Sequence, residues 1–236
     1  MINIGTEICA LNVLAGEAMV LLIDASESDG GLLLERLEST SLVESHSPEV
    51  AVSVAGRIAQ LIGKTLASPD ATSLADDASG WLIGIRQQHE IALATRTNFS
   101  EAEFSLALEI IDSMQSLDSS TMTHGDLSME NILRSPSRGW VAIDPLLVSG
   151  PITNEAHTVV RSFLPQILQS AHPAQRLNDL TRTFCDAAGA DFLEARRISY
   201  ARYVASYYWD SQNAGTSENS ERLHRATLLT YEAITK

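Results

Sequence analysis

Lysine is nearly absent from this chain, and acidic side chains far outnumber basic ones. Lys64 and Lys236 are its two lysines, and the formal net charge is −14 at pH 7. Because affinity for nucleic acid comes mainly from lysine and arginine on phosphates, this composition argues against a nucleic-acid partner. An acidic field favours cationic ligands, although solubility alone is the simpler explanation of the charge.

Long apolar runs and cysteines are scarce as well. The apolar segments, such as Met19–Ile23, are too short to cross a bilayer, and the first residues lack the basic and apolar regions of a signal peptide. We therefore expect a cytoplasmic protein without a membrane partner. Cys9 and Cys185 lie far apart in no metal-ligand spacing, so we expect buried, reduced thiols.

The order of apolar and turn-forming residues predicts a small β structure followed by a mostly helical body. Ala18–Asp24 and Leu32–Leu37 are strand candidates on either side of a turn signal in Ser26–Gly31. This arrangement predicts a β-hairpin. Residues 68–79, rich in serine, aspartate and proline, are expected to form a looser segment.

Capping residues mark the start of two helices. Ser47 with Pro48 precedes apolar residues at helical spacing, and Ser100 with Glu103 forms a capping box that opens a helix to about Leu117. Further helices are expected near residues 7–14, 155–170, 173–188, 190–211 and 218–235.

Two short motifs carry the chemistry of the chain. The first, Thr123–Asn131, reads Thr-His-Gly-Asp-Leu-Ser-Met-Glu-Asn, and the second, at residues 140–145, reads Trp-Val-Ala-Ile-Asp-Pro. Short strands are expected at 121–124 and 140–143. Each polar residue alone has an ordinary explanation as a turn residue or as the end of a strand before proline. Their joint spacing is far more specific.

Phosphoryl transfer needs residues of these types. One carboxylate accepts or orients the proton of the acceptor hydroxyl, and oxygen ligands hold Mg²⁺ on the nucleotide phosphates. Asp126 suits the first task, and Asn131 and Asp144 suit the second. A loop after a strand and the return of a hairpin can meet at one point, so the motifs predict the acidic half of a phosphoryl-transfer site.

At these residues the chain resembles the aminoglycoside phosphotransferase branch of the protein-kinase-like superfamily. It is most similar to the streptomycin 6-kinase and hydroxyurea-resistance kinase group, through His124-Gly-Asp-Leu-x-x-x-Asn131 and Trp140-Val-Ala-Ile-Asp-Pro145. The resemblance implies a kinase that uses ATP and Mg²⁺. Its acceptor would be an alcohol hydroxyl of an aminoglycoside-like or other small molecule.

The resemblance also implies a role for each residue of the motifs. Asp126 would be the catalytic base, and Asn131 and Asp144 would be the Mg²⁺ ligands. His124 and Gly125 would be structural residues that hold the turn.

A second region of resemblance follows the second expected strand. Glu35, Arg36 and Leu37 are similar to the hinge that contacts adenine in this group, so the resemblance implies that their backbone hydrogen-bonds the base. Further along, Glu155 stands where the group has an aspartate ahead of the next helix.

The fold implied by the resemblance is α+β and protein-kinase-like, with a truncated small β lobe reduced to a hairpin and a large, mostly helical C-terminal lobe. We expect the N-terminal remnant and hinge in residues 1–42 and the helical catalytic lobe in residues 43–236. Glu7 would match the helix glutamate of the superfamily, whereas Lys64 is expected on the surface. The open edge of Ala18–Asp24 predicts a homodimer.

The sequence leaves three readings of activity open. The phosphate-binding lysine and glycine-rich loop are not visible upstream of the hinge, which favours a non-catalytic protein that binds a nucleotide or a partner. The retained motif residues favour an active kinase, and a start upstream of Met1 would also account for the missing lysine. A cationic small-molecule acceptor would need an acidic pocket, for which the candidates are Asp179, Asp186, Asp191, Glu194 and Asp210.

Overall fold

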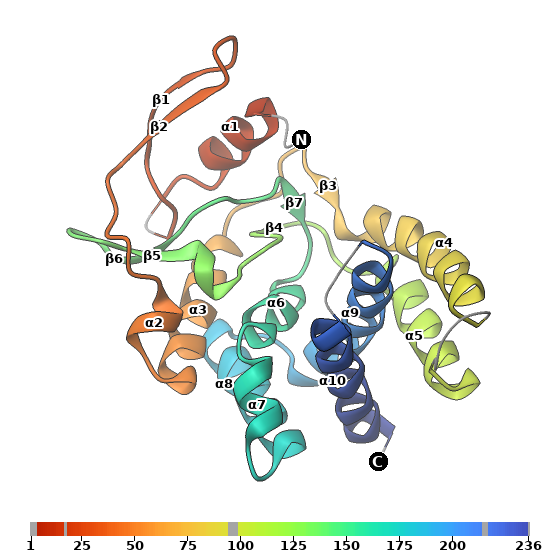
Figure 1. The fold of residues 1–236 in the computed structure, drawn as a ribbon. Helices are drawn as coiled ribbons and strands as arrows, with labels where there is room; N and C mark the ends of the chain where they lie inside the picture. The colour runs from red at the N-terminus through yellow and green to blue at the C-terminus, as the bar shows by residue number, and fades with distance from the viewer. Residues whose placement is uncertain (1–3, 17, 94–98, 214–216, 236) are drawn as a thin grey trace.

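The computed structural model describes residues 4–16, 18–93, 99–213 and 217–235. Figure 1 shows a helix and a β-hairpin at the top of the molecule and a larger group of helices below them. This arrangement is the predicted α+β fold, with a small hairpin-bearing part and a large helical part. The predicted boundary at residue 42 falls at the start of the short helix α2 (Leu42–Ser45) and stays a prediction.

One helix and one hairpin form the N-terminal part. Helix α1 spans Ile4–Val13, and β1 (Leu22–Ser26) pairs antiparallel with β2 (Gly31–Leu34) in a sheet of two strands. The hairpin and its turn are confirmed. The predicted bounds are wrong, because the first strand begins after Ala18 and the second ends before Leu37.

The residues ahead of β1 pair with the body of the molecule instead of with the hairpin. Val20 N donates to Ala142 O at 2.9 Å, and Ala142 N donates to Ala18 O at 2.8 Å. Ala142 ends strand β6 (Gly139–Ala142). The segment around Met19 therefore runs beside β6, and its burial there explains the apolar sequence that predicted a longer first strand.

The hairpin itself keeps apolar side chains in solvent. Ile23 is 62% exposed and Leu33 is 56% exposed. Exposed strand edges can pair with another chain. The homodimer expected through this edge stays a prediction.

Close packing of α3 (Pro48–Ile62) on α8 (Pro173–Ala188) anchors the helical body. A Cβ atom at Gly56 would lie 2.8 Å from Ala187 Cβ and 2.8 Å from Phe184 O, so glycine lets the two helices approach. Both helices carry proline in the first turn, where the missing N–H costs no hydrogen bond.

Helices α4 and α5 lie beside each other at one side of this body (Figure 1). Helix α5 (Glu101–Met114) begins at the predicted capping box, in which Ser100 N donates to the Glu103 carboxylate at 2.6 Å. Helix α4 (Leu74–Leu93) corrects the prediction of a loose segment through residue 79. Ser73 Oγ accepts a hydrogen bond from the backbone N–H of Asp76 at 3.0 Å, so the polar residues begin a helix.

The remaining helices complete the body. The predicted helix at 155–170 is divided into α6 (Glu155–Arg161) and α7 (Leu164–Gln169), because Pro165 in the first turn of α7 cannot donate to the preceding turn. The predictions near 190–211 and 218–235 are confirmed as α9 (Phe192–Gln212) and α10 (Ser217–Thr235).

Very short strands carry the two motifs into this body. Strand β7 (Val148–Ser149) lies between β3 (Thr72–Ser73) and β4 (Met122–Thr123). Strand β5 (Ile132–Ser135), which the sequence did not predict, pairs antiparallel with β6, whereas β4 pairs with β7. Two 3₁₀ turns, at Met129–Asn131 and Ile152–Asn154, connect these strands to neighbouring elements.

Both cysteines are free thiols, as expected. Cys185 is buried and Cys9 is partly buried. Burial raises the pKa of the Cys185 thiol to about 12, so it is protonated at neutral pH. Among the described residues, no helix combines the length and the apolar character needed to cross a membrane.

Candidate active site

The hairpin β5–β6 brings the two motifs to one place. Ile143 N donates to Asn131 O at 2.9 Å, so the pairing continues past the strands and sets Asn131 and Asp144 at the same end of the hairpin. The side-chain Nδ2 of Asn131 donates to the backbone oxygen of Asp126 at 3.0 Å. The three residues predicted to share a site are therefore neighbours.

His124 ties the loop that carries Asp126 to the segment after β6. Its Nε2 lies 3.0 Å from Ile143 O, and because a carbonyl can only accept, Nε2 carries the hydrogen. Leu146 N donates to His124 O at 2.9 Å. Burial lowers the pKa of His124, so the imidazole is neutral. This is the placement expected of a residue that holds the turn.

Gly125 occupies a position that no other residue fits without strain. Its φ is 85°, in the left-handed region, and a Cβ atom there would lie 2.8 Å from Leu146 Cβ. The glycine of the first motif is thus required both by backbone conformation and by close packing.

Glu155, the first residue of α6, holds the loop of Asp126 through its side-chain carboxylate. Its carboxylate accepts hydrogen bonds from Gly125 N at 2.6 Å, from Leu127 N at 3.2 Å and from the Thr123 hydroxyl. The residue is 1% exposed, and the start of a helix favours a negative charge. These bonds fix the backbone on both sides of Asp126, which the sequence alone did not predict.

The oxygen atoms at this site suit a hard cation. Asp126 is half-buried, Asp144 is exposed, and the use of Asn131 Nδ2 leaves the amide oxygen as an acceptor. Mg²⁺ prefers such carboxylate and amide oxygens. The described part of the chain holds no cluster of three or more histidine, cysteine or acidic side chains suited to a metal. A cation here would therefore rely on two carboxylates, one amide and its own ligands.

Asp144 also has an unusual backbone. Among the described residues it is the non-glycine residue with positive φ, at 57°. Aspartate tolerates the left-handed region better than most side chains, and Pro145 follows it. Such strained positions concentrate at functional sites.

A second acidic side chain lies near Asp144. Burial, and then the charge of Asp144, raise the pKa of Glu7 on α1. In the described part of the chain no basic residue forms an ion pair with Glu7. Lys64 is exposed in the turn after α3, as predicted for a surface residue.

The predicted hinge is fastened to the β5–β6 hairpin. Glu35 N donates to Leu21 O at 2.9 Å, and the Glu35 carboxylate accepts from Leu21 N at 3.0 Å and from Ser135 Oγ at 3.2 Å. The same carboxylate forms an ion pair with Arg138. The side chain of Glu35 therefore has a structural use.

The next two hinge residues are free to bind a ligand through their backbone. Within the described residues, neither Arg36 nor Leu37 forms a backbone hydrogen bond. The adenine contact implied for Glu35–Leu37 thus has unpaired backbone groups available, and it stays a prediction.

Comparison with known proteins identifies the family. The profile of the Aminoglycoside/hydroxyurea antibiotic resistance kinase family matches residues 4–214. The chain belongs to this family. The resemblance carried by the two motifs is confirmed, whereas a search of curated proteins found no match.

Solved structures show the fold of this resistance-kinase family member at low sequence identity. A choline/ethanolamine kinase family protein from Mesorhizobium loti superposes with a TM-score of 0.63 and 12% identity, covering 97% of this chain and 80% of that one. An aminoglycoside phosphotransferase from Alicyclobacillus acidocaldarius gives 0.59 and 13% over 98% and 81% of the two chains. The choline kinase of Cryptosporidium parvum gives 0.55 and 10% over 98% and 77%. The kinase-like fold is confirmed.

In the described part of this kinase family member, the five acidic candidates do not gather around one cavity. Asp179 and Asp186 are exposed on α8, and Asp191 caps α9 by accepting a hydrogen bond from Glu194 N at 2.7 Å. Asp210 alone among the five candidates lines a described cavity.

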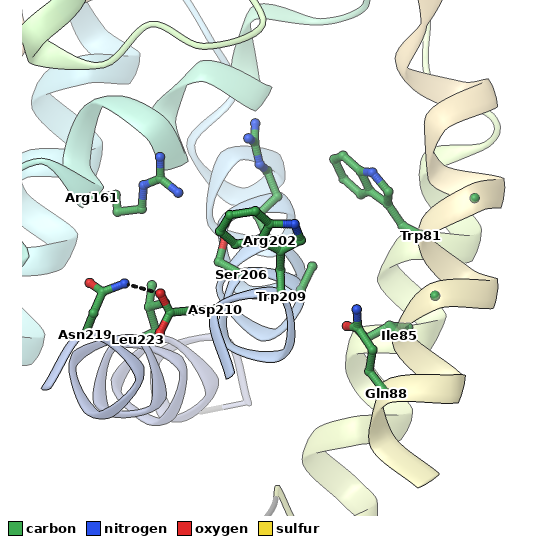
Figure 2. Close-up of a pocket in the computed structure, with 13 residues that line it drawn as sticks. Trp81, Ile85, Gln88, Arg161, Arg202, Ser206, Trp209, Asp210, Asn219 and Leu223 are labelled. Carbon is green, nitrogen blue, oxygen red and sulfur yellow. Dashed lines mark hydrogen bonds between the residues drawn. The ribbon is translucent and has the colours of Figure 1, made fainter. Parts of the chain in front are cut away.

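That cavity lies between α4, α9 and α10, with one residue from the end of α6 (Figure 2), and its volume is about 440 Å³. Its wall includes Arg202, whose Nη1 donates to Asn154 O at 3.2 Å and Asn154 Oδ1 at 2.8 Å. Burial lowers the pKa of Arg202 to about 10, while the negative charges of Glu155 and Asp126 oppose that shift. The cavity therefore adjoins the loop of Asp126.

Proposed function

We propose that this chain is a small-molecule kinase that transfers the γ-phosphate of ATP to an alcohol hydroxyl, with Mg²⁺ as cofactor. The observation that carries the proposal is the loop of Asp126, which Glu155 and His124 hold in place while Asn131 and Asp144 converge beside it. The family description, antibiotic resistance kinase, supports an acceptor of the antibiotic or aminoglycoside class.

Each residue has a defined task in this proposal. The acceptor oxygen attacks the γ-phosphorus, the bond to the β-phosphate oxygen breaks, and ADP leaves. The Asp126 carboxylate accepts the proton of the acceptor hydroxyl. Asn131 and Asp144 would hold Mg²⁺, which neutralises phosphate charge when bound. The backbone of Arg36 and Leu37 would bind adenine.

The cavity beside the loop is the proposed acceptor site. It is a concave space whose wall combines two indole rings with several polar and charged side chains, and concave sites of this kind are where small molecules bind. A ligand in it would lie next to Arg202, which in turn lies near Asp126.

Calorimetric titration with Mg·ATP tests the metal site. We expect Asp144→Ala to weaken binding by about tenfold or more, since it removes a charged ligand of the cation. Asp70→Ala, which removes an exposed carboxylate far along the chain, is the matched control and should bind like the wild type. Equal affinity in Asp144→Ala and the control would exclude the proposed metal ligands.

One observation favours a second candidate, a protein that binds a nucleotide without transferring phosphate. Glu7 and Asp144 are acidic neighbours, and no described lysine or arginine pairs with Glu7 to help hold phosphates. Incubation with labelled ATP and a panel of hydroxylated acceptors separates the two functions. Mg·ATP binding without transfer to any acceptor would favour the second.

A further inference from the structure

The cavity next to the loop carries positive charge in a strongly acidic protein. Arg161 and Arg202 both line it, and among the described residues neither forms an ion pair with a carboxylate. The charge of Arg161 also lowers the pKa of Arg202, so the two cations repel each other. A chain of net charge −14 thus keeps two guanidinium groups at one cavity without an ion pair among the described residues, although Arg202 Nη1 already donates to Asn154.

The carboxylate in the wall is already occupied. Asp210 Oδ1 accepts from Asn219 Nδ2 at 2.7 Å, and its Oδ2 accepts from Ser220 Oγ at 2.5 Å. Asp210 is 7% exposed. Its oxygens therefore bond to the start of α10, and although these neutral donors leave its negative charge in place, the two arginines outnumber it in the wall.

The rest of the wall combines indole rings and apolar residues with the polar side chains of Gln88, Ser206 and Asn219. Figure 2 shows Trp81 and Gln88 reaching from α4 toward α9, while Arg161 reaches toward α9 from the other side. Trp209 also lines the cavity, and the guanidinium of Arg202 lies 5.7 Å from the ring centre of Trp81. Indole rings offer stacking surfaces to a planar or apolar ligand body.

On these grounds we infer that the cavity selects an acceptor with an anionic group, such as a carboxylate, attached to a planar or apolar body that bears the hydroxyl. Arg161 and Arg202 would bind the anion, because guanidinium groups match carboxylates in charge and geometry. This inference rests on the proposed kinase function and narrows its acceptor. It opposes a cationic acceptor, both the one suggested by the overall net charge and an aminoglycoside, and among the acceptors of the proposed function it favours other hydroxylated small molecules.

Three probes of one shape test the charge preference. All three carry a para-hydroxymethyl phenyl group: the anionic 4-(hydroxymethyl)benzoate, the neutral 4-(hydroxymethyl)benzamide and the cationic 4-(hydroxymethyl)benzylamine. Each is titrated calorimetrically into the full chain without nucleotide or metal. We expect the benzoate to bind about tenfold more tightly than the benzylamine, which corresponds to ~1.4 kcal/mol. The benzamide should fall between them.

Variants of Arg161 test whether this residue causes the preference for the benzoate over the benzylamine. Arg161→Gln should remove most of it, and Arg161→Lys, which keeps the charge, should retain most of it. Arg57→Gln on α3 makes the same change in net charge at an exposed site and should behave as wild type. Thermal unfolding of each variant checks that it is folded.

Several outcomes would overturn the inference. Tighter binding of the benzylamine, an equal preference in Arg161→Gln and wild type, or no binding of any probe at millimolar concentration would each do so. The probe titrations and the Mg·ATP titration can fail independently, so failure of this inference can be told apart from failure of the proposed kinase function. A preference for the benzoate without Mg·ATP binding would support the anion preference of the cavity and contradict the kinase function. Mg·ATP binding without a preference for the benzoate would support the kinase function alone.

Discussion

The loop of Asp126 and the cavity lined by Arg161 adjoin each other, yet they carry opposite charge. Acidic groups gather at the loop: Asp126, Asp144, Glu155 and Glu7. Two arginines without ion-pair partners among the described residues line the cavity. Local charge therefore differs from what the net charge of −14 implies, since the acidic loop would attract a cation and the two arginines an anion.

Loss of the Asp126 carboxylate is the strongest way to break the acidic region. We expect Asp126→Asn to lower phosphate transfer by about 10²–10⁴-fold, because the proton of the acceptor hydroxyl loses its acceptor. Transfer is measured with labelled ATP and the best acceptor of the panel. Asp179→Asn, an exposed change on α8, should keep full activity. Undiminished transfer by Asp126→Asn would remove the base from the mechanism.

Removal of the Glu155 carboxylate tests how the acidic region is supported. Glu155→Ala leaves two backbone N–H groups and the Thr123 hydroxyl without their acceptor. Buried donors left unpaired cost about 1–3 kcal/mol each, so we expect a loss of about 3 kcal/mol or more in the free energy of unfolding. Urea denaturation measures it, with exposed Glu130→Ala as the control. A loss no larger than that of the control would contradict the hydrogen bonds described.

Substitution of Glu7 should have the smallest effect, a pH-dependent change in thermal stability that tests the repulsion between acidic groups in this region. Its pKa is raised by burial and by Asp144, so the folded protein holds this proton more tightly than the unfolded chain. Stability is therefore lost as pH rises from the ordinary glutamate range through the raised pKa. Glu7→Gln should unfold at a slightly higher temperature than wild type above that pKa and at a similar temperature below it.

Magnesium offers a control for that small effect. A cation at Asp144 would offset the repulsion, so added Mg²⁺ should shrink the difference between Glu7→Gln and wild type in thermal melts at neutral pH. A difference that does not change with pH or Mg²⁺ would show that Glu7 acts through packing alone.

Local signals in the sequence predicted much of the fold. Ser47 with Pro48 and the capping box at Ser100 begin helices, and the turn at Ser26–Gly31 closes a hairpin. Such features depend on neighbours along the chain. The start of α4 was missed because its serine and aspartate residues are as typical of a loop as of a cap.

The site was predicted only as far as its motifs reach. Asn131 and Asp144 meet because a short hairpin joins them, which spacing can reveal. The bonds of Glu155 to the loop join residues about thirty positions apart. The two arginines of the cavity come from different helices and carry no motif, so packing alone brings Arg161 and Arg202 together.

The length of helix α6 also sets a distance between the loop of Asp126 and the cavity. It begins at Glu155, which holds the loop of Asp126, and ends at Arg161, which lines the cavity. Six residue steps at 1.5 Å each separate its ends by ~9 Å. Because this short helix is rigid, it would fix the distance between the anionic group of an acceptor, bound at Arg161, and its hydroxyl, placed at the loop of Asp126. Helix geometry, rather than loop flexibility, would then determine which acceptor lengths fit.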